Sequence, residues 1–559
     1  MASSPIYRRS LFRSSISALT VCGLLLCGCG SGMDTSSGGG NGSGGGSGGG
    51  GGSTPAATVT AAARLLDQTS FGPTTDSIAH VQTVGLQGYL KEQFALPATT
   101  LPAVPATLPA QCSNTPVACV ESEFWEASLT ANDQLRQRVA LALSEQWVTS
   151  TQSVNGNAVL AYYNVLLNDA FSNWRTIMED VTLSPSMGLY LNMLNSAKAP
   201  AGQIANENFA REMMQLFSTG LYMLNDDGTE KKDANGNSIP VYTEAQVQAF
   251  AKAYTGWTYA AADGSSPANF PNRTVNYTSP MAPVESAHDM TQKTLLNGTV
   301  IPAGGSARND LKIALDNIFA HENLPPFVCR QLIQHLVTST PSDAYVARVA
   351  AVFRDNGKGV RGDMKAVLTA ILMDTEARAG DTNSAYDGGH LREPIFYITS
   401  VMRALGYSST ITDPANLWRY TSLSTQAAAL GEEPLRSASV FNFFPPEYVI
   451  PETTLNAPEF SLENTASVTL RLTLADKLAT NKLSNFKTTA FSSGGTLYSL
   501  AGSPGDLVDT LGVMFLHGQM PSNMRTTIVN AITGISDPAT RARVATYLVM
   551  SSSQYKVMH

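Results

Sequence analysis

Three charged side chains in one short stretch are the first residues whose types and spacing could do chemistry. Glu207, Arg211 and Glu212 lie within residues 206–221. At helical spacing they share one arc, with Glu207 and Arg211 placed one turn apart as an ion pair. In a cleft, such a carboxylate–guanidinium cluster could tune one acid for proton transfer. A solvated helix face or a structural ion network would use the same residues, and the sequence leaves these interpretations open.

His288 and Asp289 are the second candidate, because they lie in a polar loop instead of an apolar helical pattern. Adjacent residues cannot easily face one metal ion, so Glu207 or Glu212 would have to complete such a site. The ordinary alternative is a loop histidine that is hydrogen-bonded to the backbone. Three further histidines are isolated in the sequence and are interpreted as structural or exposed: His321, His335 and His390.

Sequence motifs for metals, cofactors and nucleophiles are missing. No cysteine and histidine set has zinc spacing, and there is no GxSxG, Walker, dinucleotide or HExxH motif. Asp233, Asn235, Asn237 and Glu244 partly match a calcium-binding loop, but the glycine is misplaced, so turn formation explains them better. The sequence therefore predicts no metal site and no cofactor.

Four aromatic residues could form a platform on which a sugar stacks: Trp257, Phe441, Phe443 and Phe444. Each lies in a locally apolar run. Buried core aromatics are therefore the favoured interpretation.

Helical periodicity dominates the elements that must position these residues. In the central stretch Phe209, Met213 and Phe217 recur on one face, and Gly220 suits a left-handed helix end. Asp-Gly and Asn-Gly pairs at residues 227–228 and 235–236 predict a small hairpin. We therefore predict a mainly α fold: a multi-helix, bundle-like globular domain with a small β-hairpin and long polar loops. It spans residues 56–559, as one body or as two packed subdomains. Helices are predicted over residues 61–68, 75–84, 86–94, 124–150, 159–181, 189–194, 206–219, 243–254, 311–319, 326–338, 343–355, 362–374, 394–406, 462–480, 506–515 and 537–550.

The N-terminus has the pattern of an export signal. Arginines at positions 8, 9 and 13 precede a short apolar run, and residues 26–29 read Leu-Cys-Gly-Cys. This ending resembles a bacterial lipobox, which implies a signal over residues 1–29 and a lipid on Cys29. Residues 30–55 are nearly all glycine and serine and form a flexible tether by composition. Gly30 stands where an aspartate is associated with inner-membrane retention, which favours the outer membrane.

Three of the six cysteines remain after the signal. Cys112 and Cys119 flank a short proline-containing loop, and in an oxidising compartment we expect a disulfide between them. Cys329 lies in an apolar helical pattern and is predicted to be a buried thiol.

Composition excludes some functional classes. The 559 residues carry a formal net charge of -8, which argues against nucleic acid as a partner. Hydrophobic residues make up 43% of the chain, enough for a substantial core. After the N-terminus no apolar run reaches the roughly 18 residues that a membrane-spanning helix needs.

Several short sequence blocks give the chain a resemblance to a large family of exported bacterial proteins, called domain of unknown function 1800. The central residues 206–212 carry the resemblance most strongly. The other matching blocks follow in order at residues 63–66, 71–73, 135–139, 183–188, 254–258, 288–293, 392–394 and 547–551. The resemblance implies export and a helical fold. Members of this family are often encoded beside another exported family, which implies a protein partner. It implies no reaction.

The sequence therefore predicts an exported protein of the cell envelope, held to the membrane by its N-terminal lipid, with a binding or assembly role. The alternative is an envelope hydrolase acting on a polysaccharide or a peptide. In that case Glu207 or Glu212 would be the acid and base, assisted by His288.

Overall fold

Helix-capping residues explain where many of the helices begin. The computed structural model describes residues 56–103, 105, 116–386, 388–413 and 416–559. The Thr74 side chain accepts from the Ser77 backbone and the Thr243 side chain from that of Gln246, and each begins a helix with a capping box. Pro394 occupies the first turn of its helix, where its missing N–H costs nothing. The predicted lipobox and tether lie outside the described residues.

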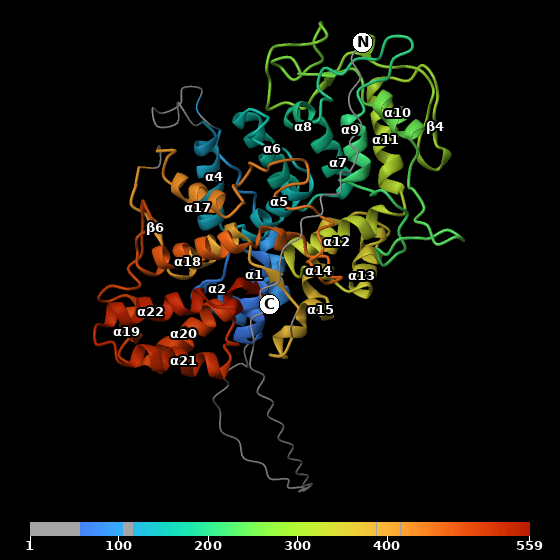
Figure 1. Cartoon of the computed structure of the whole chain (residues 1–559). Helices are drawn as coiled ribbons and strands as arrows, with labels where there is room; N and C mark the ends of the chain where they lie inside the picture. The colour runs from blue at the N-terminus through green and yellow to red at the C-terminus, as the bar shows by residue number, and fades with distance from the viewer. Residues whose placement is uncertain (1–55, 104, 106–115, 387, 414–415) are drawn as a thin grey trace, which may run out of the picture. The chain divides into compact units, whose positions relative to one another are not determined.

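Helices make up most of the described chain, which confirms the mainly α prediction (Figure 1). In the first half they are α1 (Val59–Thr69), α2 (Thr75–Val84), α3 (Leu86–Ala95), α4 (Pro116–Thr130), α5 (Gln134–Gln146), α6 (Gly156–Asp169), α7 (Trp174–Leu183), α8 (Pro185–Tyr190), α9 (Asn208–Gln215), α10 (Glu244–Ala253), α11 (Ala307–Ala320) and α12 (Leu324–Leu336). The second half contains α13 (Asp343–Arg354), α14 (Met364–Met373), α15 (Thr375–Arg378), α16 (Pro394–Ala404), α17 (Thr421–Ala429), α18 (Thr465–Ala479), α19 (Thr496–Leu500), α20 (Pro504–Leu516), α21 (Ser522–Thr533), α22 (Pro538–Met550) and α23 (Ser553–Lys556).

Strands are short and pair only two by two within the described residues. The antiparallel pairs are β1 (Trp257–Thr258) with β2 (Ala282–Pro283), β3 (Lys293–Thr294) with β4 (Val300–Ile301), β5 (His390–Leu391) with β8 (Val557–Met558), and β6 (Ser408–Ser409) with β7 (Phe486–Lys487). Short 3₁₀ turns are η2 (Glu285–Ala287), η3 (Leu296–Gly298), η4 (Ala379–Asp381) and η5 (Pro458–Leu462).

Two long helical predictions were wrong, because each covers two helices. The predicted helix 124–150 is broken between α4 and α5 near Asp133, and 159–181 is broken between α6 and α7 near Asn173. The Asn173 side chain caps α7 by accepting from the Arg175 backbone, so the chain restarts there. Five further helices were not predicted: α15, α17, α19, α21 and α23. The helix predicted over 189–194 lies earlier in the chain, as α8, which ends at Tyr190.

The predicted hairpin appears as isolated antiparallel bridges between Leu224 and Glu230 and between Lys232 and Ser238. Asp233 Oδ1 accepts from the backbone N–H groups of Asn235 and Asn237, each at 2.8 Å. Turn formation is therefore the observed role of this calcium-like segment.

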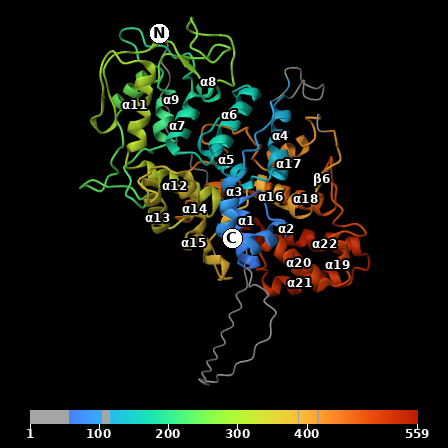
Figure 2. The ribbon, with the colours of Figure 1, turned by 180° about the vertical axis from the view of Figure 1, so that it is seen from behind.

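The first helix lies in the middle of the described fold. In both views α1 lies between the C-terminal helices α20–α22 and the group α12–α15 (Figures 1 and 2). Residues from 55 onward cluster as one unit. None of the described helices combines the length and apolar character needed to cross a membrane.

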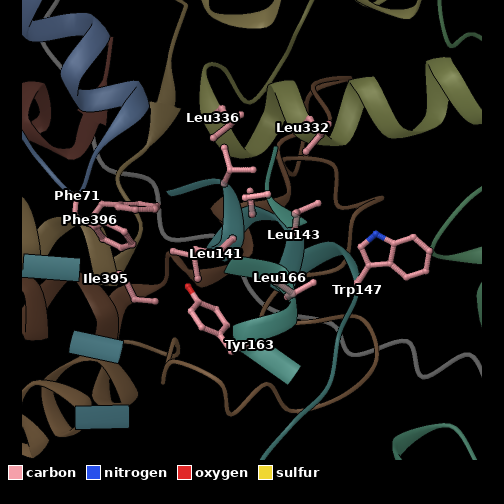
Figure 3. Packing of buried hydrophobic residues seen from close by; sticks show 14 of the residues in the cluster. Phe71, Leu141, Leu143, Trp147, Tyr163, Leu166, Leu332, Leu336, Ile395 and Phe396 are labelled. Atoms are coloured by element: carbon pink, nitrogen blue, oxygen red, sulfur yellow. The ribbon is translucent and has the colours of Figure 1, made fainter. Parts of the chain in front are cut away.

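One continuous hydrophobic core joins these helices. Around its centre, apolar side chains from α5, α6, α12 and α16 pack together, as shown for Leu141, Tyr163, Leu332 and Ile395 (Figure 3). Trp147, at the end of α5, packs on Phe217 with ring centroids 4.9 Å apart. Several charged groups are enclosed by this apolar shell.

Candidate functional site

The central-helix residues form an accessible ion-pair network. Arg211 Nη2 lies 3.1 Å from Glu207 Oε2 and 2.9 Å from Glu244 Oε1, and so joins α9 to the start of α10. The Arg211 side chain remains 37% exposed. Glu212 is half-buried, and burial raises its pKa. The helix ends earlier than predicted, at Gln215, although Gly220 does adopt the positive φ expected of it.

His288 and Asp289 lie in a different, enclosed network. His288 is fully buried, with Nε2 3.1 Å from Asp310 Oδ2. Lys293 Nζ lies 2.7 Å from the same oxygen, and Asp289 accepts a hydrogen bond from the Thr291 backbone. Among the residues that the structure describes, no hydrogen bond or ion pair joins His288 to Glu207 or Glu212.

The four aromatic residues do not form a platform together. Trp257 and Phe444 are buried, Phe443 is half-buried and Phe441 is 45% exposed. The Phe444 ring packs instead beside His335, with centroids 6.2 Å apart.

A site that sequence analysis missed lies where three helix ends meet. Glu145 is in the last turn of α5, His335 is in the last turn of α12, and Glu393 immediately precedes α16. Glu145 Oε2 lies 3.0 Å from His335 Nδ1. One carboxylate or imidazole atom from each of the three residues lies within 4.8 Å of the others. We call these residues the Glu145–His335–Glu393 triad.

Buried acidic groups continue beyond the triad. His390 Nε2 lies 2.6 Å from Glu393 Oε1, and its Nδ1 lies 3.5 Å from Glu459 Oε1. Burial alone would lower the pKa of His390, but the Glu459 and Glu393 carboxylates outweigh it and raise the pKa. Burial would raise the pKa of Glu393, yet hydrogen bonding from His390 contributes to lowering it to about 2. Glu393 is therefore a carboxylate.

Glu432 completes the surroundings of the triad. Its Oε2 accepts the Ile395 backbone N–H at 2.9 Å, so Glu432, and not the Glu393 side chain, caps α16. Burial, and then the nearby Glu393 and Glu145 carboxylates, raise the pKa of Glu432 well above its usual range. Burial therefore favours the protonated form of Glu432, whose carboxyl group is hydrogen-bonded to Glu393.

Arg138 is the guanidinium that faces these acids. It is buried, donates from Nη2 to the His335 carbonyl at 2.9 Å, and lies 3.3 Å from the centre of the Phe396 ring. Burial lowers its pKa to about 10, so it is charged at neutral pH. Together Arg138 and His390 offset part of the negative charge. Two buried atoms beside the triad still form no hydrogen bond: Glu145 Oε1 and His390 Nδ1.

A small cavity adjoins the triad, and an open groove adjoins the cavity. The cavity has a volume of about 20 Å³, and its lining includes Glu145, His335, His390 and Glu459. The groove has a volume of about 460 Å³. We call it the α9–α12 groove; its lining is Gln215, Leu216, Gly220, Leu221, Leu224, Gly228, Glu230, Pro326, Phe327, Arg330, Gln331, Gln334, Phe441, Pro445, Pro446, Glu447 and Asn456. Gln331, Gln334 and Pro446 line both spaces.

A second carboxyl pair lies in another pocket, of about 520 Å³. Burial and then the Glu433 carboxylate raise the pKa of Glu121 to about 8, and both oxygens of Glu121 are buried. Glu121 is therefore mostly protonated at neutral pH and donates to Glu433. This pocket has no histidine in its lining.

One local signal could have pointed to the triad. His390 and Glu393 are three residues apart and directly precede a proline, a spacing that brings an imidazole and a carboxylate together. Glu145 and His335 carry no such signal, because 190 positions separate them in the sequence. The disulfide between Cys112 and Cys119 stays a prediction: Cys119 is disulfide-bonded, and Cys112 lies outside the described residues. Cys329 is buried and free, as predicted.

Comparison with known proteins gives a family and nothing finer. The model of a family described as "Protein of unknown function (DUF1800)" matches residues 64–557. No curated protein and no solved structure matches the chain.

Proposed function

Because the chain belongs to the DUF1800 family, which is defined without an activity, we propose a function from the geometry of the chain itself. The protein is an exported, lipid-anchored protein of the cell envelope that binds a partner polypeptide in the α9–α12 groove. The observation that carries this proposal is the groove, an accessible apolar surface beside the central helix.

The lining of the groove suits an extended peptide. Leu221 and Phe441 are 38% and 45% exposed, so they can bury apolar side chains of a partner. The side-chain amides of Gln215 and Gln331 also line it, and neither forms a hydrogen bond with another described residue. An extended peptide offers both apolar side chains and unpaired backbone N–H and C=O groups, which these surfaces would satisfy.

Lipid attachment at Cys29 is the first prediction from this proposal. The Cys29→Ser variant lacks the thiol to be acylated, so we expect it to move from the membrane fraction to the soluble fraction of the envelope. Mass spectrometry of the N-terminal fragment should find a lipid on Cys29 only in the wild-type protein. An unmodified wild-type chain with residues 1–29 intact would contradict the anchor.

Loss of partner binding from the groove is the second prediction. A charge at Leu221 or Phe441 would have to be desolvated on binding, which costs several kcal/mol. We expect Leu221→Glu and Phe441→Glu to lose a copurifying polypeptide at least about tenfold, with melting temperatures near that of the wild type. Quantitative mass spectrometry of pull-downs from solubilised envelopes measures this. A photo-crosslinking residue at position 441 then identifies the partner segment.

Leu470→Glu is the matched control, because Leu470 is also 38% exposed but lies on α18, outside the groove. It should retain the partner. If Leu470→Glu loses the partner and Leu221→Glu retains it, the binding surface is on α18 and the groove proposal is wrong.

The hydrolase alternative has less support. It requires Glu207 or Glu212 to act beside His288, and His288 is instead enclosed with Asp310 and Lys293. A binding role therefore remains the better-supported proposal.

A further inference from the structure

We propose that the Glu145–His335–Glu393 triad binds one divalent transition-metal ion, such as Zn²⁺ or Mn²⁺. The site is independent of the groove proposal, and the sequence predicts no metal there. It rests on the juxtaposition of three ligand groups, the unpaired buried oxygen of Glu145 and the adjoining cavity.

The ligand types select this class of ion. Two carboxylates and one imidazole are a mixed oxygen and nitrogen set, which suits Zn²⁺ and Mn²⁺. Ca²⁺ prefers six to eight oxygen ligands and would gain little from the imidazole. Burial and then the Glu393 carboxylate raise the pKa of Glu145, so a cation would bind by displacing any proton held there. The two carboxylates would then supply two negative charges, which a divalent cation would balance.

One oxygen of the triad is left without a partner. Glu145 is only 7% exposed, and its Oε1 atom is buried and accepts no hydrogen bond. An unpaired buried carboxylate oxygen is costly, and a cation bound between Glu145 and Glu393 would remove that cost. Glu145 also lies at the C-terminal end of α5, where the helix dipole disfavours a negative charge. A cation bound there would offset the negative end of the dipole as well as the charge of the carboxylate.

The spacing of the triad is close to that of a bound site. Ligand atoms around a four-coordinate ion lie about 3.4 Å apart, given metal–ligand distances of about 2.1 Å. The triad atoms lie within 4.8 Å, so side-chain rotation can bring them into range. His390 would hold the outer oxygen of Glu393, the supporting contact that metal-bound carboxylates normally have.

The adjoining cavity would leave one coordination position open. Its volume of about 20 Å³ holds a single water molecule. Three protein ligands with one open position are typical of metal sites that bind an exchangeable ligand. Since Gln331 and Gln334 line both the cavity and the groove, such a ligand would come from the groove side.

Metal binding by the full folded protein tests the proposal. Protein treated with a chelator and dialysed is titrated with Zn²⁺ and Mn²⁺ separately, with Ca²⁺ as the comparison ion. We expect about one Zn²⁺ or Mn²⁺ per chain by elemental analysis and a higher melting temperature with either ion. Glu145→Gln should weaken Mn²⁺ binding at least about tenfold. Without metal it should melt no lower than the wild type, because it removes a charge next to Glu393.

Glu121→Gln is the matched control, since it also replaces a buried glutamate beside a second carboxyl group, in a pocket away from the triad. It should bind Mn²⁺ as the wild type does. Pulsed electron paramagnetic resonance of Mn²⁺ in the wild-type protein needs no variant and should detect one histidine nitrogen. Three results would overturn the site: no bound ion, no coupled nitrogen, or loss of binding in Glu121→Gln in place of Glu145→Gln.

Discussion

Replacing Asp67 by asparagine should destabilise the protein by about 3–5 kcal/mol, because it leaves the charge of Arg392 buried without a counter-ion. Asp67 Oδ1 and Oδ2 lie 2.9 and 2.7 Å from Arg392 Nη1 and Nη2, and both residues are buried. His517 Nε2 lies 2.9 Å from the same Oδ2. The Asp67 carboxylate of α1 therefore joins Arg392, just before α16, to His517, at the end of α20. Urea unfolding followed by circular dichroism measures the loss.

This contribution should depend on pH in a defined direction. Burial alone would raise the pKa of Asp67, but Arg392 and His517 hold it well below its usual range. Because the pKa is lower in the folded state, the unfolded state takes up the proton first as the pH falls. The stabilisation is thus present above about pH 4 and is lost progressively below it. The wild-type protein and Asp67→Asn should differ less at pH 3 than at pH 7.

Asp509→Asn is the control, because Asp509 pairs with Arg525 through both oxygens but on the surface. Exposed pairs contribute at most about 1 kcal/mol. If the two variants lose the same free energy of unfolding, burial does not make the Asp67–Arg392 pair more stabilising than an exposed pair.

Gly72→Ala should be a strongly damaging single-methyl addition. A Cβ atom at Gly72 would lie 2.3 Å from the Cα of Ser400 in α16, a backbone contact that no rotamer change relieves. Its φ of +125° is also rarely adopted by residues with a side chain. Overpacking and backbone strain together predict a loss of about 3–5 kcal/mol. Differential scanning calorimetry and the soluble yield measure it.

Gly202→Ala separates the two causes. Gly202 also has a positive φ, +80°, but a Cβ atom there would meet nothing within 4 Å. Its loss should be limited to about 1–2 kcal/mol of backbone strain. If both variants melt at the same temperature, close contact between Gly72 and α16 is not what makes this glycine necessary.

Local patterns predicted the fold class well. The caps at Thr74 and Thr243 and the proline that begins α16 are signals that the local sequence alone carries. The same approach merged α6 with α7, because apolar residues continue across the break and only Asn173 marks it. Periodicity reports which face is apolar; it does not report where the chain turns.

The candidate site was harder to predict for a physical reason. Glu145, His335 and Glu393 come from helices far apart in the sequence, and each looks ordinary among its own neighbours. The charged stretch at Glu207, by contrast, is conspicuous locally and turns out to be a half-exposed ion-pair network. What distinguishes the triad is burial without complete hydrogen bonding, and burial follows from tertiary packing alone.

The contact between Asp67 and His517 joins residues 450 positions apart. When α1 leaves the ribosome, His517 has not yet been synthesised. Asp67 therefore cannot form this contact until most of the chain has been made. Folding that depends on such distant contacts is slow. A nascent chain of this protein would expose an incomplete hydrophobic surface for many seconds, during which chaperones would bind it and proteases would remove truncated products.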